Sequence, residues 1–487
     1  MHGQSALEII KSLRDKLKDG RRKIVVNESQ SKVKVDGDVV MHVESRALTE
    51  FANLLTCEIL SDIEIMSLLG RPAYYPFMAL REEGQVRNEE FTRRALIELL
   101  KDKLLCKSRM NRNPADMTYK EHLAVLGVIA SIEVSAASLL ATELSSGHMR
   151  PVAGVSDDRH LVYTLELSEP VLSLAAHELI LDGVTPWSDI LRSFRRTQVT
   201  SATMRGFLAK TLAQFLMLMA WQKVLRPIIG SQTTVPFVPV VDFLKALLGS
   251  SLDASSIELL KKGLSNAFLR LNSFVKTFAY LSLDMLFAYL LRGSGVYCRE
   301  LQPAADLAIP IHHASPDSCQ VSRGSTSAFQ VQVRLWSKQV PPGKVKQCFD
   351  NMRRLHSNLT GNKAGSSVSL VLDIGAWQSS TPAVYESSDT IPPSKAARTS
   401  LTSCVLNKKG NVYEIYCTQL SVADINATDH EAETAFRMVM ESVVDPRKTG
   451  NIPQQFRRTV ANMFSTQPYM ETPPALVYNR TSTPKSE

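Results

Sequence analysis

The sequence lacks the patterns that mark the common metal and nucleotide sites. Its seven cysteines are an odd number and no two have C-x2-C spacing, so neither a zinc site nor a disulfide framework is predicted. This cysteine usage fits a reducing compartment, and we expect an intracellular protein, in the nucleus or the cytoplasm. There is no G-x-x-x-x-G-K-[ST], G-x-G-x-x-G, H-E-x-x-H or G-x-S-x-G segment, which predicts no ATP site and excludes the enzyme classes that depend on these motifs.

Long apolar runs are absent as well. The stretch 208–224 comes closest to a membrane span, but Lys210, Gln214, Gln222 and Lys223 interrupt it. A span needs about 18 consecutive apolar residues, so we expect a buried helix there and no membrane partner. The N-terminal segment 5–14 is amphipathic and charged without an apolar core, which predicts no signal peptide.

The chain does have a modest excess of positive charge. Lys and Arg number 56 and Asp and Glu 48, for a net charge of +8, which permits a polyanionic partner without requiring one. Hydrophobic residues make up 44% of the chain, enough for sizeable cores, and at about 150 residues per domain the 487 residues predict about three domains. This composition excludes wholesale disorder and collagen-like or coiled-coil rods.

The periodicity predicts an α+β protein in which a large α-helical region precedes a mixed sheet. In residues 1–45 we expect a short helix and a β-hairpin that turns at Asp36-Gly37. Residues 46–292 have helical periodicity, with an N-cap predicted at Ser168 and with Gly249 and Gly293 as expected helix ends. The helices predicted in this region cover 93–105, 121–144, 171–181, 201–225, 241–248, 256–278 and 281–291.

After Gly293 the apolar period changes from about 3.6 residues to 2, as in strands. Strands are predicted at 306–311, 328–336 and 367–374, a helix at 344–359 and a hairpin over 405–420. This order predicts a mixed α/β domain over 293–465, and the Pro-rich residues 466–487 predict a loose tail. His312 and His313 are neighbours on a strand and point to opposite faces, so they cannot chelate one ion together.

The most specific segment runs from Arg292 to Ile311, and Gln330-Val-Gln-Val-Arg334 follows about twenty residues later. Together with Ser146-Gly-His-Met-Arg150 and Leu167-Ser-Glu-Pro-Val-Leu172, it resembles a group of basidiomycete fungal proteins related to Crinkler-type effectors and retrotransposon hot spot proteins. Members carry R-G-x4-C-x3-Q-P-x2-D-L-x-I-P and then a strand that ends in Q-V-K. The residues on these patterns are Arg292, Gly293, Cys298, Gln302, Pro303, Asp306, Leu307, Ile309, Pro310, Gln332, Val333 and Arg334, with Arg334 in the place of the Lys.

The resemblance, which covers about residues 120–340, implies a restriction-endonuclease-like fold with the D…(E/Q)-x-K site of metal-dependent nucleases. Asp306 would then bind Mg²⁺, Gln332 would be a weaker second ligand, and Arg334 would contact a phosphate. Mg²⁺ prefers anionic oxygen ligands, so one carboxylate in place of two lowers the expected affinity. An arginine stays charged and cannot shuttle a proton, so the site is expected to be degenerate.

The segment 321–370 carries most of the excess positive charge. It has eight basic residues and one acid, Asp350, so its net charge is 8 − 1 = +7. Such a stripe can neutralise several phosphates, which predicts a nucleic acid partner, DNA first, and binding that weakens with salt. The alternative is that these charges form an ordinary solvated helix face. The residues that we expect to hold the phosphates are Lys338, Lys344, Lys346, Arg353 and Arg354.

Three interpretations stay open from the sequence: an active metal-dependent nuclease, a degenerate nuclease fold that still binds nucleic acid or protein, and a protein unrelated to nucleases. In the third, Gln332 and Arg334 lie on an ordinary strand face and Asp306 caps a strand. The alternative function is a non-enzymatic effector or a mobile-element-derived protein whose helical region binds protein partners. Convergence of Asp306, Gln332 and Arg334 over one pocket would favour the nuclease.

Overall fold

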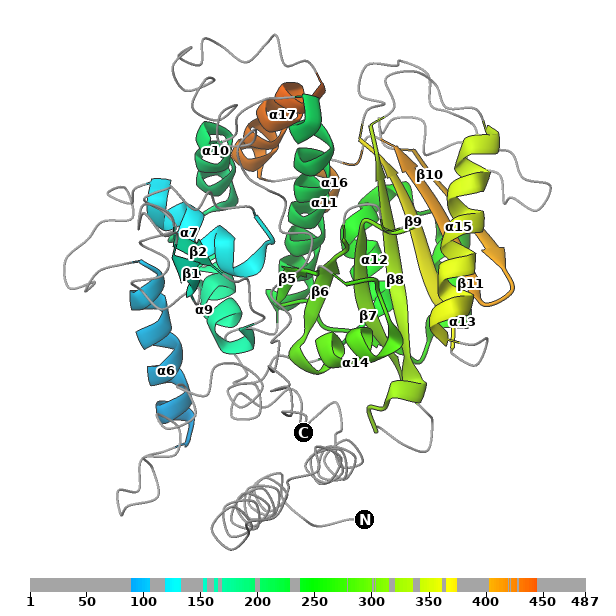
Figure 1. Cartoon of the computed structure of the whole chain (residues 1–487), viewed down its shortest axis with the longest axis horizontal. Coiled ribbons are helices and arrows are strands. Elements are labelled where there is room, and N and C mark those ends of the chain that lie inside the picture. The colour runs from blue at the N-terminus through cyan, green and yellow to red at the C-terminus, as the bar shows by residue number, and fades with distance from the viewer. Residues whose placement is uncertain are drawn as a thin grey trace, which may run out of the picture.

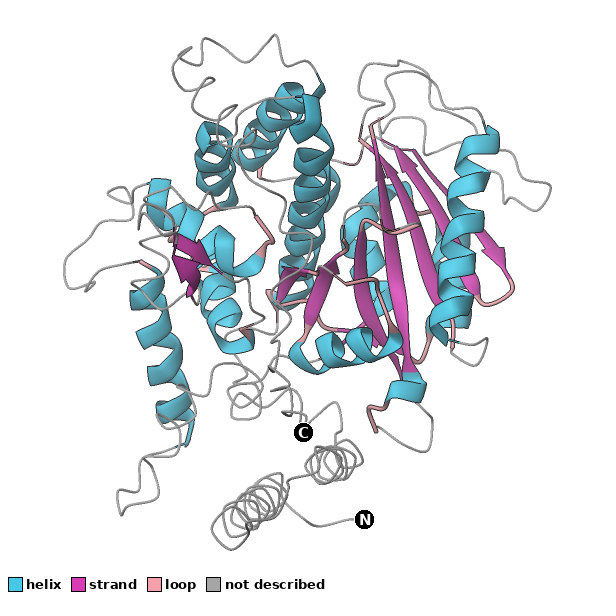
Figure 2. Ribbon diagram, in the orientation of Figure 1, coloured by secondary structure: helices cyan, strands magenta, loops and turns pink. Residues whose placement is uncertain are grey.

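The computed structural model describes residues 89–105, 119–132, 152–155, 162–164, 169–197, 202–227, 237–277, 279–299, 302, 304–314, 320–335, 342–360, 365–374, 403–418, 420, 422–426 and 429–444. The helix and hairpin predicted within 1–45, the tail 466–487, Lys338 and Trp336 lie outside these residues. A group of helices stands on one side of a large mixed sheet, and further helices cover the two faces of that sheet (Figure 1, Figure 2).

Most of the predicted helices are confirmed, with shifted ends. α10 and α17 were not predicted, and the short strands β1 (Val152–Val155) and β2 (Val162–Thr164) form a separate antiparallel pair. None of the described helices combines the length and apolar character needed to traverse a membrane. The helices are α6 (Glu89–Leu104), α7 (Tyr119–Ile129), α9 (Pro170–Leu181), α10 (Trp187–Thr197), α11 (Ala202–Leu225), α12 (Val240–Leu248), η3 (Gly249–Ser251), α13 (Ala254–Leu264), α14 (Leu283–Arg292), η4 (Arg323–Ser325), α15 (Pro342–Thr360), α16 (Val422–Ile425) and α17 (His430–Val444).

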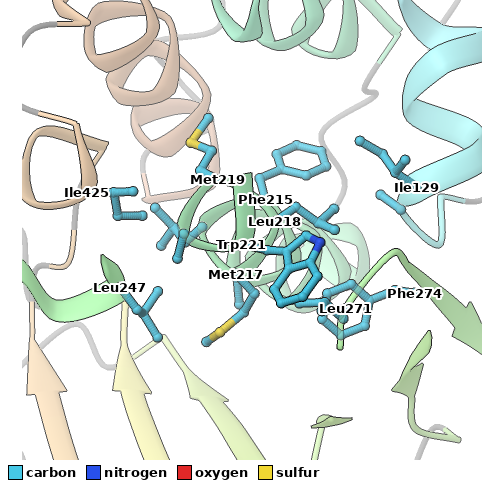
Figure 3. Close-up of a cluster of buried hydrophobic side chains, with 14 of the residues drawn as sticks. Ile129, Phe215, Met217, Leu218, Met219, Trp221, Leu247, Leu271, Phe274 and Ile425 are labelled. Carbon is cyan, nitrogen blue, oxygen red and sulfur yellow. The ribbon is translucent and has the colours of Figure 1, made fainter. Parts of the chain in front are cut away.

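The long helix α11 is the centre of the hydrophobic core. Its apolar side chains are almost all buried, and Figure 3 shows Phe215 and Trp221 of α11 in one cluster with Leu271 and Phe274. Two of the polar residues that interrupt its apolar run make specific buried contacts. Gln222 accepts a hydrogen bond from Trp187 Nε1 at 2.6 Å and lies 2.8 Å from the Nδ1 of His177.

Gln214, another of these polar residues, explains why the helix predicted over 121–144 stops early. α7 ends at Ile129, and residues 130–132 are not helical. The backbone N–H of Ser131 donates to Gln214 Oε1 at 2.9 Å, and Gln214 Nε2 donates to the Ser131 carbonyl at 3.4 Å. Because the side-chain amide satisfies both backbone groups, the chain can leave the helix inside the core without losing hydrogen bonds.

A buried ion-pair network joins α6 to the end of α9. Lys101 of α6 is 1% exposed, and its Nζ lies 2.5 Å from Glu178 and 3.1 Å from Asp182 at the end of α9. α9 itself starts at Pro170, with Glu169 as its N-cap residue in place of the predicted Ser168. No side chain caps this helix start; the proline at the first position removes one of the N–H groups that would need a partner.

The sheet has the strand order β10-β11-β9-β8-β7-β4-β3, and β6 pairs with both β7 and β5. β7 is antiparallel to β6 and β8, whereas β8, β9 and β11 are mutually parallel and β5 is parallel to β6. Therefore β5, β6, β8, β9 and β11 all run in the same direction. The strands are β3 (Val238–Pro239), β4 (Ala267–Leu269), β5 (Ser273–Lys276), β6 (Ser294–Tyr297), β7 (Leu307–His313), β8 (Thr326–Arg334), β9 (Ser367–Asp373), β10 (Ser403–Lys409) and β11 (Val412–Thr418).

Three strands of this sheet come from the region predicted to be wholly helical. The helix predicted over 256–278 ends at Leu264, and the chain continues into β4 and β5. Phe268 and Leu269 of β4 pair with β7, and the Asn266 carbonyl accepts from Ala314 N at 2.8 Å. Pairing with a strand some forty residues later overrides the local helical pattern here. The expected boundary at 292/293 thus runs through the sheet, and one hydrophobic core extends across it.

The two faces of the sheet are covered by different helices. Phe329, Val331 and Val333 of β8 belong to the core around α11 and α12, and the rings of Phe329 and Phe243 meet edge to face at 5.9 Å. The opposite face lies against α14 and α15, where Val371 packs with Phe349. The predicted hairpin is confirmed as β10–β11, with its turn at Gly410-Asn411; a φ of +61° at Gly410 matches a type II′ turn.

Gly293 ends α14 in the left-handed conformation, with φ +63°, as the sequence predicts. A Cβ atom added there would lie 2.5 Å from the Nε of Arg270 and 2.9 Å from the Nδ2 of Asn272. Both of those side chains are buried, so the position needs glycine for its backbone and for the space around it.

Candidate functional site at the carboxyl edge of the sheet

The polar residues that the sequence singles out gather at one edge of the sheet. β5, β6, β8 and β9 end there at Lys276, Tyr297, Arg334 and Asp373, and β7 begins there directly after Asp306. We call this set of strand ends the carboxyl edge. Ligands of open α/β sheets bind at the carboxyl ends of parallel strands, so this edge is the candidate functional site.

Asp306 is fixed at this edge by its backbone and by its side chain. Its N–H donates to the Val331 carbonyl at 2.8 Å, and its own carbonyl accepts from Cys298 N at 2.9 Å. The carboxylate continues the ladder, because its Oδ2 accepts from the Val333 N–H at 2.8 Å. Its Oδ1 lies 2.9 Å from Nζ of Lys210, and these side chains are only 16% and 21% exposed respectively. Asp306 is therefore hydrogen-bonded to both neighbours of Gln332 on β8: its backbone N–H to Val331 and its carboxylate to Val333.

Lys210 is a residue of the candidate site that the sequence did not single out. It lies on α11, where the sequence shows it only as an interruption of an apolar run. Its Nζ is 5.8 Å from the centroid of the Tyr297 ring, and Nζ of Lys276 lies at the same distance from that ring. A lysine in the middle of a mostly apolar central helix must find a partner, and this was the available signal.

Burial raises the pKa of the neighbouring Cys298 thiol well above its usual range, and the negative charge of Asp306 adds to the effect. Cys298 is fully buried in the cluster on the α14 side. It is therefore a packing residue and not a nucleophile.

Gln332 and Arg334 lie close to Asp306 along the backbone, but their side chains have other surroundings. Gln332 pairs in register with Val371, which packs under α15, and its side chain is on this face. It is 5% exposed, and its Oε1 accepts no hydrogen bond. Arg334 is half-buried and pairs in register with Asp373. Among the described residues no hydrogen bond joins Asp306 to either side chain, so the three are neighbours without converging on one group.

These residues do not fit a Mg²⁺ site as they are arranged. The ion takes several hard oxygen ligands, preferably anionic. Both oxygens of the Asp306 carboxylate already have partners, one of which is a lysine cation, and the unpartnered oxygen of Gln332 lies under α15. The part of the chain that the structure describes contains no group of three or more His, Cys, Asp or Glu side chains able to hold a metal ion.

The segment before Asp306 has an unusual backbone. Ala304 has φ +81°, the one positive φ among the described residues other than glycine. Its side chain is 5% exposed and packs in the cluster under α15. Such a conformation costs about 1–3 kcal/mol and persists where the surroundings impose it, often near functional groups. Here the conformation of Ala304 sets the direction in which the chain enters β7, and so the position of Asp306 at the start of that strand.

Other residues of the R-G-x4-C-x3-Q-P-x2-D-L-x-I-P segment have structural tasks. Gln302 accepts a hydrogen bond from Leu281 N at 3.0 Å and so ties the loop before Asp306 to the start of α14. Pro310 lies inside β7, opposite Ala328 of β8. On its other side β7 pairs with β6 only at 307–308 and with β4 only at 311–313. The missing N–H of the proline therefore falls in a gap between two neighbours.

α15 presents a stripe of basic and neutral polar residues to solvent, and its one acid, Asp350, is paired with Arg353. Because β8 ends at the carboxyl edge, the helix that follows it starts there and runs back along the sheet (Figure 1). Of the predicted phosphate contacts on α15, Lys344, Lys346 and Arg354 are exposed. Arg353 instead points inward and pairs with Asp350 and with the buried Glu414. The α15 stripe consists of Lys344, Lys346, Gln347, Arg354, Ser357 and Asn358.

A cation and an aromatic ring lie just beyond the carboxyl edge. Tyr280 follows β5 and is 59% exposed, and Arg299 follows β6 and places its guanidinium 5.0 Å from the Tyr280 ring centroid. An exposed tyrosine next to an arginine can stack on a base and contact a phosphate. His356 of α15 is buried at 7% exposure, so its ring is not presented to a base at this surface.

The histidine pair lies at the opposite end of β7. His312 Nδ1 is 3.1 Å from Ser325 Oγ, and His313 Nε2 is 2.7 Å from Ser327 Oγ. Burial lowers the pKa of each imidazole to about 4, so both are neutral near pH 7. Each ring is held by a different serine, as expected for neighbours that do not share a ligand.

Comparison with known proteins gives one match, to a domain of unknown function, DUF8736, over residues 116–321. The matched region includes α11 with Lys210 and extends through β7 with Asp306, but it ends before β8 with Gln332 and Arg334. No curated protein and no solved structure matches the chain. The ion pair thus lies within the matched region, which also crosses the boundary expected at 292/293. The resemblance to Crinkler-type and retrotransposon hot spot proteins stays a prediction.

Proposed function

We propose that this protein binds nucleic acid along the carboxyl edge and the α15 stripe, on a degenerate restriction-endonuclease-like core. The resemblance implies an acid on one strand and Gln-x-Arg on its neighbour. In support, β7 and β8 are adjacent strands, and Asp306 forms hydrogen bonds with the residues before and after Gln332. The two departures from a working site, Gln332 for an acid and Arg334 for Lys, agree with a protein that retains binding rather than hydrolysis.

The distribution of charge is the observation that carries the proposal. Lys344, Lys346 and Arg354 are exposed on α15, where the side chain of Asp350 is 41% exposed but paired with Arg353, and Arg299 is exposed near the carboxyl edge. The acids nearby are engaged: Asp306 pairs with Lys210, and Asp350 pairs with Arg353. A polyanion can therefore bind these cations without displacing an acidic side chain from them. Each phosphate that they neutralise adds to the salt dependence of binding.

Fluorescence anisotropy with labelled DNA and RNA oligonucleotides tests the proposal. A variant with Lys344→Gln, Lys346→Gln and Arg354→Gln removes three positive charges from the stripe. We expect weaker binding and a slope of log K against log salt that is shallower by about 0.9 for each duplex phosphate that the variant no longer neutralises.

The matched control removes the same charges elsewhere, through Lys223→Gln, Arg226→Gln and Lys262→Gln, which change exposed residues at the end of α11 and on α13. Lys223 lies 13 residues along α11 from Lys210, about 20 Å at the helical rise. If the control weakens binding as much as the stripe variant, or if binding does not change with salt, the α15 stripe is only a solvated surface.

Hydrolysis is tested separately, because the arrangement around Asp306 does not fit a metal site. Plasmid DNA is incubated with the protein and Mg²⁺ or Mn²⁺, alongside Asp306→Ala. We expect no cleavage above background by either protein. Cleavage by the unchanged chain that Asp306→Ala abolishes would restore the nuclease interpretation.

The alternative, a non-enzymatic protein that binds partners through its helices, predicts a broad exposed apolar groove. Among the described residues, the exposed large hydrophobic side chains are Leu99, Tyr280 and Met438. They lie on α6, after β5 and on α17, and isolated apolar residues of this kind are normal on a protein surface. The described helices therefore favour nucleic acid over a helix-groove partner.

A further inference from the structure

The hairpin at the outer edge of the sheet carries a pair of facing thiols. Cys404 of β10 and Cys417 of β11 are directly opposite in the antiparallel register, and Cys404 Sγ donates to Cys417 Sγ at a distance of 2.7 Å. Lys409 and Val412 close the two-residue turn and form a hydrogen-bonded pair. Hydrogen-bonded and non-hydrogen-bonded pairs alternate from there along the hairpin, and Cys404–Cys417 is a non-hydrogen-bonded pair. Side chains come closest in such pairs, where the Cα atoms are about 4.5 Å apart.

This spacing suits a covalent bridge. A disulfide spans Cα distances of about 4.4–6.8 Å, so the two strands need not move apart or together to form one. Both residues are free thiols in the structure, and the other described cysteines, Cys298 and Cys348, are buried in different clusters. We propose that Cys404 and Cys417 form a reversible intramolecular disulfide when the protein meets a hydroperoxide, and that this pair is its oxidation site.

The two thiols have different environments, which assigns their roles. Cys404 is half-exposed on the edge strand, whereas Cys417 is fully buried, and burial raises the pKa of its thiol well above the usual range. Cys404 is therefore the sulfur that the peroxide reaches. β10 is the outermost strand of the sheet, so no neighbouring strand covers this side of the hairpin among the described residues.

The chemistry balances with hydrogen peroxide as the oxidant. The Cys404 thiolate attacks one peroxide oxygen, the O–O bond breaks, and the departing hydroxide takes the thiol proton to leave as water. This gives a sulfenic acid on Cys404. The Cys417 sulfur then attacks the Cys404 sulfur, the S–O bond breaks, and the second oxygen leaves as water with the Cys417 proton. Two thiols are oxidised by two electrons while one peroxide is reduced to two waters.

The bridge would fasten the edge strand to the strand that supports α15. Cys417 lies next to Tyr416, whose hydroxyl donates to Asp373 at 3.5 Å, and three residues from Glu414, which holds Arg353. The disulfide closes the loop 404–417 and so restricts the unfolded chain, which stabilises the hairpin against fraying from the sheet. This inference is independent of the proposed nucleic-acid binding.

The test is peptide mapping of the full chain after exposure to hydrogen peroxide. The protein is acid-quenched, unfolded, alkylated and digested, and the cysteine peptides are identified by mass spectrometry. We expect peptides containing Cys404 and Cys417 to appear cross-linked, with the loss of two hydrogen atoms, and to return to alkylated monomers after dithiothreitol. Cys298 and Cys348 serve as internal controls and should stay alkylated.

Two variants separate the roles of the sulfurs. In Cys417→Ala the sulfenic acid of Cys404 has no facing thiol, so a dimedone adduct should accumulate on Cys404, whereas Cys404→Ser should leave Cys417 reduced. The unchanged chain decides the matter even if a variant folds poorly. Full alkylation of both cysteines after peroxide, or a bridge from Cys404 to any other cysteine, would overturn the proposal.

Discussion

The ion pair between Lys210 and Asp306 should be energetically coupled, because it joins the central helix to the sheet in a half-buried setting. Their charged atoms are 2.9 Å apart, which at an effective dielectric constant of about 20 gives an attraction of about 6 kcal/mol. Desolvation and lost side-chain freedom offset most of this. Exposed pairs retain less than about 1 kcal/mol, and hydrogen bonds to charged groups about 1.5–3 kcal/mol. With side chains 21% and 16% exposed, we expect a coupling of about 1–2 kcal/mol.

A double-mutant cycle measures this coupling. Lys210→Met removes the cation, and Asp306→Asn removes the negative charge while keeping an oxygen that can accept from Val333 N–H. Each single variant leaves one charge without its partner, so the double variant should be less destabilised than the sum of the two by about 1–2 kcal/mol. Urea unfolding gives the four free energies of unfolding, those of the unchanged chain and of the three variants, and an unchanged m-value would show that the unfolded state is comparable.

The control cycle uses an ion pair on the surface. Lys261 and Glu258 of α13 are 2.6 Å apart, but their side chains are 52% and 69% exposed, so their coupling should be below about 0.5 kcal/mol. Adding 1 M salt should weaken this surface pair more than Lys210–Asp306. If the two cycles give equal coupling, the reasoning from burial is wrong, and Lys210 would be no more than a lysine near the carboxyl edge.

Three further predictions concern the stability of the fold. Lys101→Met removes the buried cation beside Glu178, which keeps a pairing with the exposed Arg94, and should cost about 1.5–3 kcal/mol, whereas exposed Lys103→Met should stay within about 0.5 kcal/mol; similar losses in urea unfolding would contradict the buried network. Burial lowers the pKa of His177 from 6.5 to about 4. The unfolded chain therefore binds a proton that the folded chain does not, so stability falls as pH drops from about 6.5 to about 4, at up to about 1.4 kcal/mol per pH unit. Thermal unfolding of His177→Gln across this range should lack that share of the slope, and parallel curves would refute it. Gly293→Ala should cost more than Gly183→Ala, because both have positive φ but only Gly293 has atoms within 4 Å of the added Cβ. Equal decreases in Tm would show that the side chains around Gly293 move to accommodate the added methyl group.

The elements that the sequence predicts well are those whose signals are local. The strict alternation of 328–336 predicts β8, and the helices that became α11, α12 and α14 have apolar periodicity with a glycine after the last two. The elements that the sequence predicts wrongly are those whose structure is determined by contacts with residues far along the chain. α7 stops because Gln214 takes over the backbone groups of Ser131 from 83 positions away. β4 and β5 form because β7 and β6 offer them partners, which outweighs a helical pattern in their own residues.

The candidate site divides in the same way. Asp306 could be singled out because it lies in a segment with a recognisable pattern at the start of a strand. Its partner could not, because Lys210 is 96 positions earlier on a helix whose approach to the sheet no local pattern encodes. Gln332 and Arg334 were placed on the correct strand face relative to each other, but the sequence could not show that α15 covers this face. The position of a covering helix depends on the crossover between β8 and β9, which only the assembled sheet fixes.

The structure also changes what the patterned segment from Arg292 to Ile311 means. Gly293 ends a helix against buried side chains, Gln302 ties a loop to α14, and Pro310 occupies a gap in the pairing of β7. Each of these needs its residue type for the fold alone, so most of the pattern would be present in a protein with no catalytic role. Asp306 differs, because a strand can begin without a carboxylate whereas here the carboxylate is held by a lysine from another part of the chain. The Lys210–Asp306 pair and the cations around it therefore indicate a site at this edge, whereas the patterned segment by itself indicates only the sheet.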